Sequence, residues 1–240
     1  MSSVRVDAVL LDIDGTIIDS NDAHAHAWVE AIQEDGLRTA FDIVRPLIGM
    51  GGDKLLRIAA NLDAETDRGR RINKRQLRLF DCRLPDLQPT SGARALLKRI
   101  HECGIEIVVA TSAHGDEVRK LLRQAGVADL IDEISSSDDA EESKPDPDIV
   151  LAALTRVQVP ADRAVLVGDT PYDVDAALRA GVRTIALRCG GWWPDEAFEQ
   201  AIAIFDDPAD LLAAFDRSPI GRATEADPVR SSNSGGSAVR

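Results

Sequence analysis

Two carboxylates stand at the end of the first apolar run in the chain. Residues 8–11 are apolar, and Asp12 and Asp14 follow them, one residue apart and close to Gly15 and Thr16. Asp and Gly are common where a strand ends in a turn, so the pair alone has an ordinary structural explanation. In a chemical interpretation, one carboxylate attacks an electrophile while its neighbour transfers a proton. The rest of the chain has to decide between the two interpretations.

Polar residues also follow two later apolar runs, and a lysine lies in a polar loop between them. They are Thr111 and Ser112, Asp169 and Asp173, and Lys144. Each has an ordinary role when taken alone, as a strand-end hydroxyl, a helix N-terminal acid or a surface lysine. In an open parallel sheet, however, ligands bind at the carboxyl ends of the strands. We therefore expect these residues to meet Asp12 and Asp14 on one rim of a sheet.

Such a group of side chains suits phosphoryl transfer. Crowded carboxylates repel one another, and Mg²⁺ relieves the repulsion because it takes oxygen ligands, commonly one or two carboxylates together with a substrate phosphate. Lys144, Thr111 and backbone N–H groups would bind the negative phosphoryl group. One carboxylate would attack phosphorus and form an aspartyl-phosphate. A second carboxyl group would protonate the leaving oxygen and later deprotonate water.

The elements that must position these residues alternate along most of the chain. Amphipathic helical patterns separate the expected strands, which lie at residues 6–11, 105–110, 132–137, 164–168, 183–187 and 201–205. Alternating strands and helices predict an α/β fold with a doubly wound, Rossmann-like parallel sheet. Two of the later helices have start signals, Asp146 before Pro147 and Thr170 before Pro171.

One long helical block interrupts this alternation after the first strand. We expect residues 20–87 to form a separate helical cap domain, inserted into a core domain made of residues 1–19 and 88–216. The last stretch, residues 217–240, is polar and rich in Ser and Gly, and it is expected to be disordered.

Four short motifs carry a resemblance to a known family. "DIDGT", the strand-end Thr111, Lys144 before Pro145, and "GDTPYD" occur in the same order as the four motifs of the haloacid dehalogenase superfamily, which they resemble. The resemblance covers roughly residues 5–215. The insertion, which opens with "DSNDAHAHAWVEA", is similar to the α-helical cap of the phosphoglycolate phosphatase and β-phosphoglucomutase branch.

The resemblance implies a role for each motif residue. Asp12 would be the nucleophile and a Mg²⁺ ligand, and Asp14 the general acid and base, with its backbone carbonyl also on the metal. Thr111 and Lys144 would hold the phosphoryl group, and Ser112 is placed with them among the substrate-binding residues. The remaining acids belong to "GDTPYD": Asp169 would bind Mg²⁺ directly, and Asp173 through water.

These roles predict a Mg²⁺-dependent phosphatase that acts on a small phosphorylated metabolite through an aspartyl-phosphate. The presence of Asp14 favours phosphoryl transfer, since dehalogenases of the family lack this residue. A β-phosphoglucomutase-like sugar phosphomutase is the alternative. The sequence does not favour a signalling receiver domain, because such a domain is about half this length and lacks both the insertion and "GDTPYD". A non-catalytic protein would not need Asp12, Asp14, Thr111, Lys144 and Asp169 together.

Within the insertion, the glycine-rich segment 48–54 is the place where a cap loop would touch the substrate. It would bring Gly49, Met50 and Lys54 near the leaving group, although a simple turn between helices explains the glycines equally well. His24 faces either the mouth of the site or the core. Outside the insertion, the loop with Trp192 and Trp193 is interpreted as packing or as a surface for a partner.

Composition narrows the remaining possibilities. The chain of 240 residues has 28 Lys and Arg against 41 Asp and Glu, a net charge of -13, so neither nucleic acid nor an anionic membrane is an expected partner. Three separated cysteines are typical of reduced thiols, and with no apolar stretch of membrane-spanning length we expect a cytoplasmic protein. The sequence indicates neither the physiological substrate nor an oligomeric state.

Overall fold

The computed structural model describes residues 5–224, in which six strands form one parallel sheet. The strands, in the spatial order β3-β2-β1-β4-β5-β6, are β1 (Ala8–Leu11), β2 (Glu106–Ala110), β3 (Glu133–Ser135), β4 (Ala164–Gly168), β5 (Arg183–Leu187) and β6 (Ala203–Phe205). In the central pairings, Leu11 lies opposite both Val109 and Val167. Because these strands are in register, β1, β2 and β4 end at one level of the sheet.

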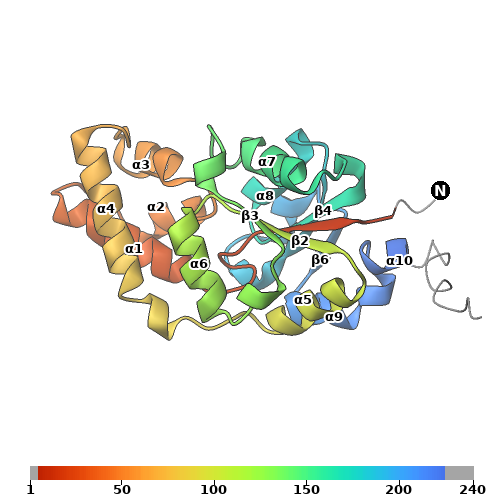
Figure 1. Cartoon of the computed structure of the whole chain (residues 1–240). Coiled ribbons are helices and arrows are strands. Elements are labelled where there is room, and N and C mark those ends of the chain that lie inside the picture. Colours follow the sequence, from red (N-terminus) through yellow and green to blue (C-terminus); the bar gives the residue numbers. More distant parts are fainter. Residues whose placement is uncertain (1–4, 225–240) are drawn as a thin grey trace, which may run out of the picture.

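Helices cover both faces of the sheet (Figure 1). One face carries α5 (Ala93–Glu102), α6 (Gly115–Gln124) and α9 (Pro208–Ala213), and the other carries α7 (Asp148–Val157) and α8 (Pro171–Arg179). In β1, Val9 and Leu11 pack on the first face while Leu10 packs on the second. Successive strand residues point to opposite faces, so a continuous apolar run fills two cores. The predicted doubly wound sheet is confirmed.

The segment after β1 forms helices with a core of their own. They are α1 (Asn21–Glu34), α2 (Phe41–Val44), α3 (Gly52–Ala60) and α4 (Asp67–Asp81), which gather at one end of the molecule (Figure 1). Trp28, Leu55 and Ile72 belong to this cluster, whereas Phe80 near the end of α4 packs into the core of the sheet part. The arrangement is compatible with an inserted cap, and the division at residues 19/20 and 87/88 stays a prediction.

The two helix starts with capping signals gave different outcomes. The Thr170 hydroxyl accepts a hydrogen bond from the backbone N–H of Asp173 and caps α8, which begins at Pro171 as predicted. The expected cap at Asp146 was wrong, because α7 begins at Asp148 and its start has no side-chain cap. The Asp146 carboxylate instead binds Lys54 and Arg179.

The end of the described chain corrects the predicted tail. Residues 217–219 follow α9 closely, Ile220 is fully buried, and α10 (Gly221–Thr224) comes next. Ile220 packs into the core, and the Ser218 hydroxyl accepts hydrogen bonds from the backbone N–H groups of Ile220 and Gly221, although the composition of the whole tail is polar. The remainder of the predicted disordered tail, residues 225–240, lies outside the described residues. None of the described helices is both long and apolar enough to cross a membrane.

Candidate active site

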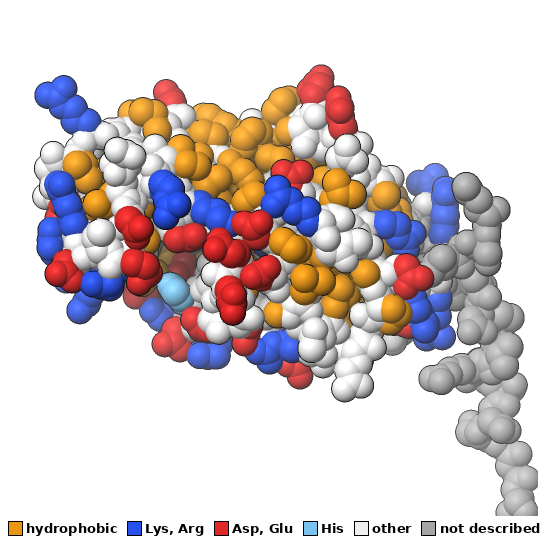
Figure 2. Space-filling view, turned by 90° about the horizontal axis from the view of Figure 1, so that it is seen from above, with side chains coloured by type: hydrophobic (Ala, Val, Ile, Leu, Met, Phe, Trp, Pro, Cys, Tyr) orange, Lys and Arg blue, Asp and Glu red, His pale blue; other side chains and the backbone are white. Residues whose placement is uncertain are grey.

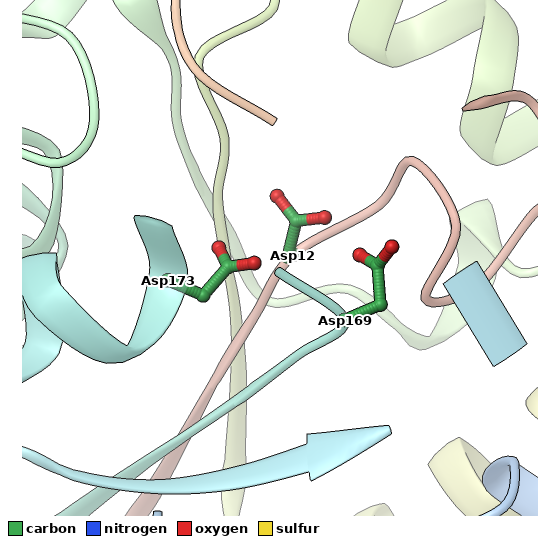
Figure 3. A group of neighbouring side chains, drawn as sticks. All are labelled: Asp12, Asp169 and Asp173. Atoms are coloured by element: carbon green, nitrogen blue, oxygen red, sulfur yellow. The ribbon is translucent and has the colours of Figure 1, made fainter. Parts of the chain in front are cut away.

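The ends of three neighbouring strands bring the first site residues together. Asp12 follows β1, Thr111 follows β2 and Asp169 follows β4. Asp173 comes from the first turn of α8, and its carboxylate points toward those of Asp12 and Asp169 (Figure 3). Carboxylate oxygens of these three acids lie within 4.8 Å of one another, and all three side chains are buried. The structure thus brings Asp12, Thr111, Asp169 and Asp173 together on one rim of the sheet, as predicted.

Lys144 lies fully buried between two of these acids. Its ammonium donates to Asp12 Oδ1 at 2.7 Å and to Asp173 Oδ1 at 2.7 Å. Burial works to lower the pKa of Lys144, but the two carboxylates outweigh it and the net pKa is raised. The ammonium therefore stays charged, and it is a structural partner of the acids as well as a candidate phosphate ligand.

Asp173 has both of its carboxylate oxygens occupied. Oδ1 accepts from Lys144, while Oδ2 accepts from the hydroxyl of Thr170 at 2.6 Å and from its backbone N–H at 3.1 Å. These bonds are half of a reciprocal capping box at the start of α8. Because Oδ1 is paired with an ammonium and Oδ2 accepts two hydrogen bonds, this carboxylate suits contact with a cation through water better than direct ligation.

Asp169 is oriented by the last residue of the first motif and by the first residue of α1. Thr16 Oγ1 donates to Asp169 Oδ1 at 3.0 Å, and Asn21 Nδ2 donates to Oδ2 at 2.8 Å. Burial, with the nearby charge of Asp173, raises the pKa of Asp169 to about 7. Gly15 approaches this carboxylate so closely that a Cβ there would clash with it, and its φ of +76° is a conformation that favours glycine.

Asp12 combines burial with one free oxygen. Burial raises the pKa of Asp12 well above its usual range, the neighbouring acids add to the rise, and Lys144 opposes it. Oδ1 binds Lys144, whereas Oδ2 accepts no hydrogen bond from residues 5–224. The donor set is made of oxygen alone, and its charged form is costly without a further cation. The cluster of acids therefore fits a hard divalent ion.

Asp14 faces the helical insertion rather than the other acids. It accepts hydrogen bonds from Ser20 Oγ at 2.5 Å and from His24 Nε2 at 3.0 Å. Although burial works to raise the pKa of Asp14, the charge and hydrogen bond of His24 outweigh it and the net pKa is lowered. His24 thus resolves the choice between mouth and core: it is buried, and it contacts the site.

His24 is itself held by three residues that the sequence did not single out. Its ring stacks on Phe80 with the centroids 3.7 Å apart, and its Nδ1 lies 3.4 Å from the Gln76 amide nitrogen. Glu117 of α6 approaches Nε2 at 3.5 Å. Burial works to lower the pKa of His24, but Asp14 and then Glu117 raise it overall. The sequence singled out only His24 of this group; Gln76, Phe80 and Glu117 gave no signal in it.

A cavity of about 220 Å³ opens above Asp12 and Asp14. Thr111 and Ser112 line it from the sheet side, and Gly49 and Met50 line it from the insertion. Lys54 was expected there as well, and this expectation was wrong. Its ammonium binds Asp146 and the Ser143 carbonyl, because a nearby carboxylate competes for it outside the cavity.

The loop with two tryptophans packs at the junction of the insertion and the sheet part. The Trp192 ring lies 5.6 Å from the Arg45 guanidinium carbon, and the Trp193 ring meets Tyr172 edge to face at 6.0 Å. The Tyr172 hydroxyl donates to the carbonyl of Pro46 at 2.7 Å. These contacts favour packing as the role of the loop, although Trp192 is 39% exposed.

Comparison with known proteins places the chain in a family. The model of the haloacid dehalogenase-like hydrolases matches residues 9–187. Phosphoglycolate phosphatase from Rhodospirillum rubrum is 32% identical over 213 residues, which cover 85% of this chain and 88% of that protein. The crystal structure of a hydrolase from Pseudomonas syringae has a TM-score of 0.80 at 28% identity, and the match covers 88% of this chain and 98% of that one.

A putative β-phosphoglucomutase from Bacteroides vulgatus has a TM-score of 0.81 at 22% identity, over 93% of this chain and 92% of that one, and shows likeness of fold alone. The resemblance carried by the four motifs is confirmed by the family match and by the phosphoglycolate phosphatase relative. The chain is an enzyme, and it belongs to the haloacid dehalogenase-like hydrolases.

Proposed function

We propose that this hydrolase is a Mg²⁺-dependent phosphatase that cleaves a small phosphomonoester through an aspartyl-phosphate on Asp12. The observation that carries the proposal is the state of Asp12: one oxygen is anchored by Lys144, and the other is free at the floor of the cavity. A carboxylate fixed in this way is aimed for in-line attack on phosphorus, which is largely a matter of positioning. The phosphatase named among the relatives supports hydrolysis.

The positive charges of the site would act on the phosphoryl group. The divalent ion, held by Asp12 and Asp169 and reached by Asp173 through water, would polarise the phosphoryl oxygens and neutralise the charge of the transition state. Thr111 and Ser112 line the cavity beside Asp12, and in this proposal they would donate to the other oxygens. Lys144 would hold Asp12 charged and in orientation for the attack.

Asp14 would move the protons of both half-reactions. In the first, its carboxyl group would protonate the leaving alkoxide; in the second, its carboxylate would take a proton from the attacking water. The hydrogen bond from His24 favours the charged form, which is the form needed to accept that proton. The insertion thereby contributes a residue to the chemistry of the sheet part.

The mutase alternative rests on the likeness of fold, and the likeness to the putative β-phosphoglucomutase is below 25% identity. A mutase would have to retain a bisphosphate intermediate and return the phosphoryl group to a second hydroxyl. Conversion of a sugar phosphate without release of inorganic phosphate would favour it.

Phosphate release from a panel of phosphomonoesters tests the proposal. We expect release with Mg²⁺, loss of release with EDTA, and loss in the Asp12→Asn variant at an unchanged circular dichroism spectrum. The Asp216→Asn variant is a matched control, because Asp216 is exposed and pairs with Arg99 far from the cavity. Activity in Asp12→Asn equal to that of the wild type would overturn the mechanism.

A further inference from the structure

The walls of the cavity carry acidic and amide groups, and each of the two histidines that line it faces a carboxylate. Asp53, Glu65 and Glu117 line it above the two catalytic acids, as do Asn73 and Gln76. Among the described residues that line it, none is a lysine or an arginine. Asp and Glu side chains also gather around a hollow on the face drawn in Figure 2. The part of the substrate that lies beyond the phosphoryl group therefore meets negative and neutral surroundings.

The nearest basic side chains are committed elsewhere. Lys54 binds Asp146 and the Ser143 carbonyl, and Lys144 lies under Asp12, where it is fully buried between two carboxylates. The buried guanidinium of Arg45 binds Asp22 and the Gly190 carbonyl and does not line the cavity. The two histidines of the lining are also engaged, His24 by Asp14 and Glu117 and His114 by Asp138. A second anionic group on the substrate would therefore find no unpaired cation among the described residues that line the cavity.

Asn73 is the wall residue best placed to recognise an uncharged polar group. Its side chain makes no hydrogen bond with residues 5–224, although it is half-buried, and it lies beside Gly52 and Trp28. Gln76, one helical turn further on, is buried, and its amide nitrogen already contacts His24. An amide offers both a donor and an acceptor, which is what an alcohol hydroxyl requires.

We propose that the substrate is the monophosphate of an uncharged, hydroxylated alcohol of the sugar or polyol type, and that an ester carrying a carboxylate or a second phosphate is disfavoured. The inference rests on the proposed phosphatase function. It separates this chain from a phosphoglycolate-specific enzyme, because the glycolate carboxylate would face Asp53 and Glu117. It also disfavours the mutase, because a bisphosphate would have to place its second phosphate against the same wall.

The test compares two esters that differ only at the far carbon, 2-phosphoglycolate and 2-hydroxyethyl phosphate, alongside hexose and pentose monophosphates. We expect kcat/KM for the hydroxyethyl and sugar esters to exceed that for phosphoglycolate by at least about tenfold, since an unpaired anion at an acidic wall is selected against. Equal values, or a preference for phosphoglycolate, would overturn the inference. Hydrolysis of p-nitrophenyl phosphate in the same assay keeps this outcome distinct from failure of the phosphatase itself.

Two variants at one position separate charge from shape. Asn73→Lys places a cation on the wall, and we expect it to raise the phosphoglycolate to hydroxyethyl phosphate ratio of kcat/KM by about tenfold. Asn73→Met has a similar unbranched length without the charge and should leave the ratio low. A ratio that lysine does not raise, in a variant that still hydrolyses p-nitrophenyl phosphate, would overturn the role given to wall charge.

Discussion

His24 joins the helical insertion to Asp14, the proposed general acid and base. It is the residue through which Gln76, Phe80 and Glu117 act on that carboxylate, because each of them contacts the imidazole ring. Since buried carboxyl groups normally have raised pKa values, the lowered pKa of Asp14 is a specific consequence of this contact. The charge state of the proposed acid and base is thus set from outside the sheet part.

Replacing His24 with Gln should move the pH profile of the second half-reaction. Without the imidazole, burial is no longer outweighed and the pKa of Asp14 rises. Hydrolysis of the aspartyl-phosphate needs charged Asp14, so its acid limb should shift to higher pH and the rate should fall most on the acid side of neutral. Single-turnover kinetics across pH measure this.

His26→Gln is the matched control, because His26 lies on the same helix, is exposed, contacts Phe41 and does not line the cavity. An acid limb that stays in place in His24→Gln would show that this contact does not set the protonation of Asp14.

At the residue scale, the positions of side chains that directly follow a strand could be predicted from the sequence. The convergence of Asp12 and Asp169 needed only the parallel sheet. Contacts that depend on how helices pack could not be predicted from the sequence. An example is the contact of His24 with Glu117, which joins α1 to α6. The same reason explains the wrong predictions for Asp146 and Lys54. These two side chains form a salt bridge between distant parts of the chain, and neither has the role that its local sequence favoured.

The start of α8 shows how an element can position a site. Thr170 caps the helix and at the same time donates to the Asp173 carboxylate, so one residue serves both the stability of the helix and the orientation of the acid. Its neighbour Gly168 is tightly placed too, because a Cβ there would clash with Asp173.

Thr170→Ala should therefore have two effects that a simple cap would not combine. Loss of the cap should lower the free energy of unfolding by about 1 kcal/mol. Loss of the hydrogen bond to Asp173 should weaken divalent metal binding by about tenfold. Asp207→Ala removes the side-chain cap of α9 and should cost similar stability, measured by urea unfolding, with metal affinity unchanged. Equal metal affinity in both variants would refute the second role of Thr170.

The strand ends also predict how metal binding depends on pH. In the absence of a cation, the pKa of Asp169 is raised to about 7, against an ordinary value near 3.8. A carboxylate must be charged to bind a cation, so protons compete with the metal below this pKa and affinity increases as pH rises through 7. The same raised pKa costs the metal-free protein stability as pH rises from about 4 to 7, and the cation restores it.

Thermal unfolding with and without Mg²⁺ measures this competition. The gain in Tm from a fixed Mg²⁺ concentration should be larger at pH 8 than at pH 5.5, and Asp169→Asn should abolish the difference. A gain that is the same at both values of pH would contradict the proposed metal site.

At the element scale, the alternation of strands and helices and the parallel sheet followed from apolar runs and turn residues. Their ends did not follow as well, and the expected strand at residues 6–11 is shorter as β1. The packing of Ile220 was missed because one buried isoleucine weighs little against a polar, serine-rich context.

At the scale of the whole molecule, the cavity belongs to both parts of the chain. Asp12 and Asp14 form its floor on the sheet side, and Asn73 and Trp28 line it from the insertion. The overall charge of -13 would repel a phosphorylated ligand. In the proposed function, the positive charge that offsets this repulsion lies at one point, at Lys144 and the proposed divalent ion. In the proposed function, phosphoryl recognition and recognition of the leaving group would thus be divided between the two parts.

The covalent state of Asp12 during turnover tests the central claim most directly. The enzyme would be mixed with Mg²⁺ and a phosphomonoester that it hydrolyses. The reaction would be quenched in acid within milliseconds, and the protein digested and analysed by mass spectrometry. We predict one phosphoryl group on the peptide that contains Asp12, and none without Mg²⁺ or in Asp12→Asn. Turnover with no phosphorylated peptide at any quench time, or with the phosphoryl group on another residue, would contradict the account.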